Sequence, residues 1–199
     1  MARFLSRQFQ HGGDIYHLEL SIDRIAALRD DLTVNILVRR YSPDGDGGVT
    51  IEAALTLDLG RNEIVIEIEG EELGRIPLDA TAVADADEAD AGAEGVARDA
   101  WDALTDHLFN DEGNRTEKAI ESIIESIPAG DPFLGCLLKG AISASVGQII
   151  RCHRLIDPRE ETVARKLRSI ANCLGRNVRG ILGRATVRSL RCMVSLGFG

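Results

Sequence analysis

The stretch VTIEAALTLDLGRNEIVIEIEG, residues 49–70, decides the fold of the first part of the chain. Apolar side chains occupy every second position in both of its halves, and Gly60-Arg61-Asn62 lies between them. A period of two is typical of β-strands with one buried face, and the three residues between the halves suit a tight turn. The stretch therefore predicts two antiparallel strands joined by a hairpin.

The same alternation continues on both sides of this hairpin. It predicts further strands at 16–22, 32–38 and 73–78, and Pro77 favours an edge position for the last of them. Turn residues separate the strands, so we expect an antiparallel β-meander of four or five strands with one buried and one wet face. The first 13 residues are expected to be exposed or to lead into the first strand.

Composition changes at residue 79. The segment DATAVADADEADAGAEG, residues 79–95, has few large apolar side chains and is typical of an acidic, flexible linker. The sequence thus predicts three parts: an antiparallel β domain (1–78), an acidic Ala/Asp-rich linker (79–95) and a helical domain with basic C-terminal helices (96–199).

Helical periodicity runs from residue 96 to the end of the chain. Helices are expected at 96–108, around 120–127, and after each of two Asp-Pro pairs, Asp131-Pro132 and Asp157-Pro158, which suit an N-cap followed by the first helical residue. Glycines at 180 and 183 predict a break in the helix that starts at 158, and a last helix after it. The expected fold class is α+β, with the meander followed by a bundle of four or five helices.

Charge is strongly segregated along the chain. The 199 residues have a formal net charge of −9, but residues 151–199 hold eleven basic and three acidic side chains, a charge of +8. The remaining residues therefore carry −17, of which −10 lies in residues 85–126, with thirteen acids and three bases. A polarised chain of this kind limits which partners each end attracts.

Basic residues of the C-terminal part of the chain gather on one side of the predicted helix. Four arginines fall within an arc of about 80°, opposite an apolar stripe on the same helix. Three more follow the glycines. These seven are the candidate partner-binding residues: Arg165, Arg168, Arg176, Arg179, Arg184, Arg188 and Arg191. Guanidinium groups suit carboxylate and phosphate.

Recognisable catalytic and metal-binding patterns do not occur in the sequence. The cysteines, at 136, 152, 173 and 192, form no CxxC pair, and the chain has no nucleophile elbow, P-loop or HExxH string. We therefore assign no catalytic residue, metal ligand or cofactor. The chain is expected to be cytoplasmic, with buried, reduced cysteines. The excess of Arg over Lys favours a bacterial source.

The leading hypothesis is a non-enzymatic interaction, assembly or regulatory protein. Its basic C-terminal helix would dock on an acidic protein surface, through self-association or on another protein. A nucleic-acid-associated regulator that uses the same arginines is an alternative, although the net charge of −9 argues against it. A membrane-active effector built on the apolar helix 132–150 is a second alternative, which Lys139 disfavours, and no transmembrane segment is expected.

Overall fold

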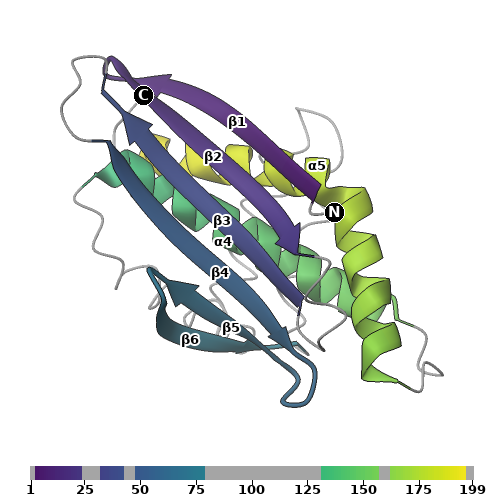
Figure 1. Ribbon diagram of the computed structural model, residues 1–199. Coiled ribbons are helices and arrows are strands. Elements are labelled where there is room, and N and C mark those ends of the chain that lie inside the picture. The colour runs from purple at the N-terminus through teal and green to yellow at the C-terminus, as the bar shows by residue number, and fades with distance from the viewer. Residues whose placement is uncertain (1–2, 24–31, 43–47, 79–130, 157–161, 196–199) are drawn as a thin grey trace.

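A computed structural model describes residues 3–23, 32–42, 48–78, 131–156 and 162–195 of the chain. This part contains a six-stranded sheet followed by two helices (Figure 1). The strands are β1 (Arg3–His11), β2 (Asp14–Asp23), β3 (Leu32–Tyr41), β4 (Val49–Asp58), β5 (Glu63–Ile68) and β6 (Glu71–Pro77). The helices are α4 (Pro132–Arg154) and α5 (Val163–Ser195).

The sheet is an antiparallel meander in the order β1-β2-β3-β4-β5-β6, so strands adjacent in sequence are also adjacent in space. The five expected strands are present, with Pro77 in the edge strand β6. A sixth strand, β1, forms where the sequence predicted only an exposed or strand-leading segment. The two-residue loop Gly12-Gly13 joins it to β2, with φ angles of 60° and 91°. Positive φ at both loop residues is the requirement of the tight hairpins that match strand twist.

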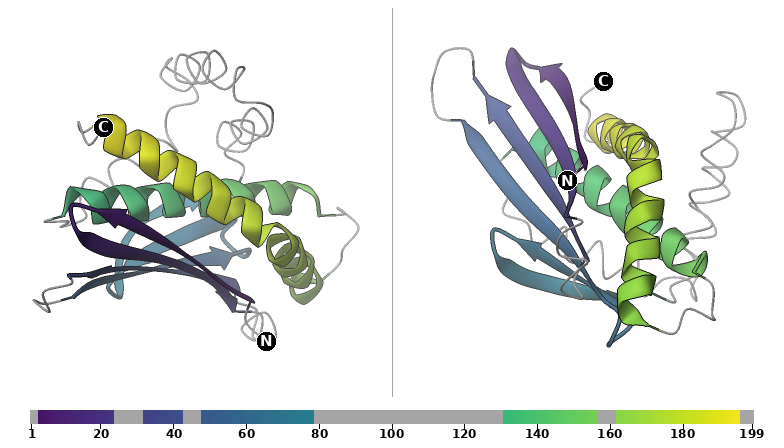
Figure 2. Two further views of the ribbon diagram at one scale, coloured as in Figure 1. Left: turned by 90° about the horizontal axis from the view of Figure 1, so that it is seen from above. Right: turned by 45° about the vertical axis from the view of Figure 1, so that its right-hand side comes forward.

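Both helices lie on the same face of the sheet (Figures 1 and 2). The α4 helix packs mainly on β3 and β4, and α5 packs on β1 and β2. Side chains that point to this face alternate with exposed or half-buried ones, as the pattern along β4 shows. The sheet and both helices contribute to one hydrophobic core, built mainly from Leu, Ile and Val.

Asp131 fixes the start of α4. One of its carboxylate oxygens accepts hydrogen bonds from the backbone N–H groups of Phe133 and Leu134, at 2.9 and 3.3 Å. Pro132 takes the first helical position, which confirms the N-cap predicted from the Asp-Pro pair. The other oxygen accepts from the Tyr16 hydroxyl at 3.1 Å and from the Arg40 guanidinium at 2.8 Å. The N-terminus of α4 is thereby tied to β2 and β3.

The apolar α4 helix is buried on most of its surface. Its 18-residue apolar window has the length and composition of a membrane span, and 83% of that window is buried inside the protein. Gly140 lets α5 approach closely, because a Cβ atom at this position would lie 2.6 Å from the carbonyl oxygen of Ala185. The missing side chain at Gly140 thus serves helix–helix contact.

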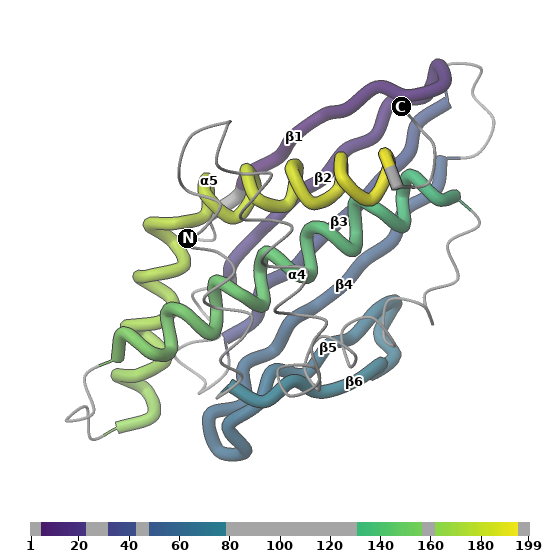
Figure 3. The backbone as a smooth tube through the Cα atoms, turned by 180° about the vertical axis from the view of Figure 1, so that it is seen from behind, coloured from purple at the N-terminus to yellow at the C-terminus, as the bar shows by residue number. Residues whose placement is uncertain are grey.

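The expected bundle of four or five helices is wrong. Two helices follow the sheet in the described residues, and α5 runs without interruption from Val163 to Ser195. No break occurs at Gly180 or Gly183, because the buried neighbours Ile181 and Ala185 hold the helix against the core. The helix instead bends sharply along its length (Figure 3), as glycine-containing helices often do. The helices expected at 96–127 and the linker 79–95 lie outside the described residues.

The expectation of reduced cysteines is also wrong. Disulfides join Cys136 to Cys192 and Cys152 to Cys173, and no free cysteine remains. Each bond crosses from α4 to α5. The spacing of the cysteines explains the pairing, because 16 residues separate the two in α4 and 19 separate the two in α5, which are similar lengths along two antiparallel helices.

Candidate docking surface

The first half of α5 has one buried and one exposed side. The helical period predicted an apolar stripe that begins at Val163, but Val163 is 48% exposed. The other members are buried against the rest of the protein, as predicted: Leu167, Ile170, Leu174, Val178 and Ile181. The opposite side carries Arg165, Arg168, Arg176 and Arg179, which are all exposed. We call these four residues the arginine stripe.

The side chains of the arginine stripe make no hydrogen bond or ion pair with any described residue. They form two pairs, 165/168 and 176/179, each with a spacing of three residues. The pairs are eleven residues apart, which is just over three helical turns and about 16 Å along the axis. The two arginine pairs therefore lie on the same side of α5 at a fixed separation.

The three later arginines have different surroundings. Arg184, Arg188 and Arg191 are half-buried, and each makes a polar or electrostatic contact within the protein. Arg184 donates a hydrogen bond to the side-chain carbonyl oxygen of Gln148 on α4. The seven arginines that the sequence grouped together thus divide into an exposed set of four and a half-buried set of three.

Positive charge dominates the helical layer. The α4 and α5 segments contain eleven Lys and Arg residues and no Asp or Glu. Burial, followed by the positive charges of Lys166 and Arg154, lowers the pKa of His153 below its usual value. The His153 side chain is therefore less readily protonated than an exposed histidine.

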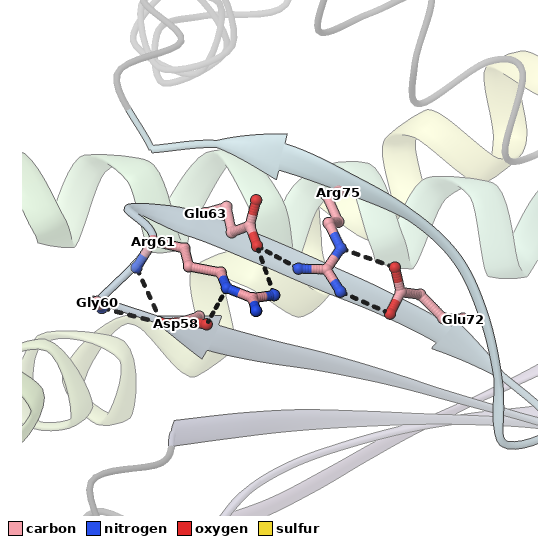
Figure 4. A network of polar contacts seen from close by, with 6 residues as sticks. All are labelled: Asp58, Gly60, Arg61, Glu63, Glu72 and Arg75. Carbon is pink, nitrogen blue, oxygen red and sulfur yellow. Dashed lines mark hydrogen bonds and ion pairs between the residues drawn. The ribbon is translucent and has the colours of Figure 1, made fainter.

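Ion pairs link charged side chains of the sheet, in contrast to the arginine stripe. Arg75 on β6 bridges Glu63 of β5 and Glu72 of β6, with nitrogen–oxygen distances of 2.7 and 2.9 Å to Glu72 (Figure 4). In the same network Arg61 lies within 3.9 Å of both Asp58 and Glu63. The contrast between the paired ions of the sheet and the arginine stripe of α5 marks the stripe as the candidate docking surface.

Two hollows lie on the surface of the described residues, one on the sheet and one beside α5. The face of the sheet away from the helices has a hollow of about 390 Å³, whose charged lining is acidic: Glu19, Glu52 and Glu67. A smaller hollow, of about 260 Å³, lies between the end of α4 and α5 and includes Arg176 of the stripe and Leu155, which is 74% exposed. Among the described residues, no group of three His, Cys, Asp or Glu side chains is placed to hold a metal ion.

The sequence missed the difference between the two sets of arginines and the two disulfides. The helical period placed the arginine stripe correctly on the side opposite the core. It could not show that the later arginines lie in half-buried positions, because that depends on the bend of α5. The similar cysteine separations in two successive helices were the available signal for the disulfides.

Comparisons with known proteins found no relative of this chain. No protein-family model, no curated protein and no solved structure matches the chain. The function is therefore inferred from the residues and their surroundings alone.

Proposed function

We propose that this chain is a non-enzymatic interaction or assembly protein that docks the first half of α5 on an acidic protein surface. The observation that carries the proposal is the arginine stripe: four exposed guanidinium groups on one helix side, without an acidic partner among the described residues. Such groups form charge-assisted, two-pronged hydrogen bonds with carboxylates. A rigid helix presents them without the cost of ordering a loop.

The geometry specifies the partner further. The two arginine pairs require carboxylates at two places about 16 Å apart along the docked surface. An acidic helix with Asp or Glu pairs three turns apart meets this requirement. The segment 85–126 of this chain, which lies outside the described residues, carries the negative charge that the arginines require. A second copy of the chain could supply it, in keeping with self-association.

The test compares matched double variants. Arg165→Gln/Arg168→Gln removes one pair of the stripe, and Arg176→Gln/Arg179→Gln removes the other. Arg61→Gln/Arg75→Gln is the control, because it removes two charges from the sheet. Exposed charge pairs contribute about 0.2–1 kcal/mol each, so each stripe variant should weaken partner binding about two- to thirtyfold.

Binding is measured by affinity capture followed by mass spectrometry, and then with the purified partner at several salt concentrations. Acidic proteins should be captured by the natural chain and by the Arg61/Arg75 control, and lost from both stripe variants and at high salt. Identical captured sets for all variants would show that the proposal is wrong. Steep, salt-sensitive binding of DNA or RNA fragments without any acidic protein would instead favour the nucleic-acid alternative.

A further inference from the structure

The 260 Å³ hollow between α4 and α5 opens onto a disulfide. Both Cys152 and Cys173 line it, together with Asn172 and Arg176. Both cysteines are buried, with Cys173 7% exposed and Cys152 1% exposed, so Cys173 is the less buried of the two. Neither Cys136 nor Cys192 lines this hollow, because the second disulfide lies at the other end of the helix pair.

Hydrogen-bond donors surround this disulfide. The Gln148 amide nitrogen lies 3.4 Å from Cys152 Sγ, and the Asn177 amide nitrogen lies 3.8 Å from Cys173 Sγ. Arg184 holds the carbonyl oxygen of Gln148, which fixes the amide so that its N–H group points at Cys152. The fixed N–H donor would stabilise a thiolate formed at Cys152 and so favour its release as a leaving group.

The pocket also has a positive charge at its wall. Arg176 lines it, and no described acidic side chain pairs with this arginine. A small thiol that carries carboxylates would be attracted to this place, whereas a cationic thiol would be repelled. The less buried cysteine, the hydrogen-bond donor to Cys152 and the anion-attracting arginine all lie around one cavity.

We propose that Cys152–Cys173 is a thiol-exchange site for a small acidic thiol, a carboxylate-bearing thiol peptide of the glutathione class. The thiol first loses its proton to solvent, and its thiolate attacks Cys173 Sγ. A new S–S bond forms there, the Cys152–Cys173 bond breaks, and the electron pair leaves on Cys152 Sγ, which then takes a proton. A second thiolate attacks the small-thiol sulfur of the mixed disulfide, releases Cys173 and departs as the oxidised dimer, so two thiols supply the two electrons.

Exposure alone favours the other disulfide, because Cys192 is half-buried whereas Cys173 is buried. The selection comes from the pocket, from the donor at Cys152 and from Arg176. The proposal does not depend on the docking function above, since it concerns a covalent step with a small molecule. The two can therefore succeed or fail separately.

The experiment exposes the oxidised full-length protein to three thiols: glutathione, neutral 2-mercaptoethanol and cationic cysteamine. Acid quenching and mass spectrometry then locate the adducts, and rates are expressed per thiolate. We expect the first glutathione adduct on Cys173, with Cys136–Cys192 still intact, and a faster rate for glutathione than for cysteamine. Arg176→Gln should reduce this preference about two- to fivefold.

Two further variants complete the test. Arg179→Gln removes a neighbouring charge that does not line the pocket, so it should keep more of the preference for glutathione than Arg176→Gln does. Gln148→Glu keeps an oxygen for Arg184 but removes the N–H donor to Cys152, so it should slow all three thiols about two- to tenfold. Circular dichroism checks that each variant is folded.

Three results would overturn the proposal. The first is opening of Cys136–Cys192 before Cys152–Cys173. The second is a first adduct on Cys152. The third is an unchanged preference for glutathione in Arg176→Gln.

Discussion

Gly140 of α4 and Ala185 of α5 lie so close that a methyl group on Gly140 would sit 2.6 Å from the Ala185 carbonyl oxygen. The same methyl group would lie 2.8 Å from the backbone nitrogen of Ser189. Both obstacles are backbone atoms of a packed helix, so neither can rotate away. The approach of the two helices therefore depends on the absence of a side chain at one position.

Gly140→Ala should lower the free energy of unfolding by about 1–3 kcal/mol, because the helices must move apart to admit the methyl group. Gly183→Ala is the matched control. A Cβ at that position of α5 has nothing within 4 Å, so the change should stabilise the protein by up to about 1 kcal/mol through helix propensity. Urea unfolding measures both. Equal effects of the two substitutions would contradict the close approach.

Asp131 combines a helix cap with an ion pair, and two substitutions separate these roles. Asp131→Ala removes both and leaves Arg40 without its closest partner, so it should cost about 2–3 kcal/mol of stability. Asp131→Asn keeps an oxygen that can cap the helix and should cost about 1 kcal/mol. Thermal unfolding at pH 7 distinguishes them. If Asn cost as much as Ala, the cap would contribute nothing.

Tyr16 gives the protein a dependence on alkaline pH. Burial, followed by the negative charge and hydrogen bond of Asp131, raises the pKa of Tyr16 to about 12, from 10.0. The folded state therefore retains the phenol proton longer than the unfolded state does. This contribution to stability is fully present below pH 10 and is lost as the pH rises toward 12, amounting to about 1 kcal/mol lost by pH 11.

Tyr16→Phe should remove this alkaline loss. At pH 8 the variant should be less stable than the natural protein by about 1 kcal/mol, since the hydrogen bond to Asp131 is gone. At pH 11 the difference should shrink or vanish. Urea unfolding of both proteins at the two pH values tests the expectation. A difference that is the same at both pH values would show that Tyr16 does not titrate as stated.

The two disulfides should stabilise the fold unequally. The cysteines of Cys136–Cys192 are 56 residues apart and those of Cys152–Cys173 are 21 apart. Cross-links that close longer loops restrict the unfolded chain more, by about 4 and about 3 kcal/mol respectively. Double Cys→Ala variants of each pair, compared by urea unfolding, should follow this order. The reverse order would mean that packing of the sulfur atoms outweighs the restriction of the unfolded chain.

Alternation of apolar residues predicted the strands well because one face of the sheet is buried. Residues such as Leu55 and Ile66 are fully buried, and their neighbours in sequence are not. The β1 strand escaped prediction because Arg7 interrupts its apolar side. The guanidinium of Arg7 donates a hydrogen bond to Thr186 of α5 at 3.2 Å, a partner 179 residues away that no local pattern reveals.

The helical period also predicted the arginine stripe, because the angular position of a residue around the helix determines whether it faces the core or the solvent. Whether its charges are compensated is a property of the folded chain. The cysteine pairing and the number of helices depend in the same way on how α4 and α5 meet. The break predicted at Gly180 and Gly183 does not occur, because α5 is continuous and the buried Ile181 between them packs against the core.

The two disulfides have a consequence for proteolysis. They cross-link α4 and α5 at two levels, with the connection between the helices enclosed by both pairs, 152–173 and 136–192. A protease that cuts once between residues 154 and 163 would therefore not release the C-terminal piece. The product would be a two-chain molecule held together by sulfur, still carrying the arginine stripe, and its fragments would separate on a gel only after reduction.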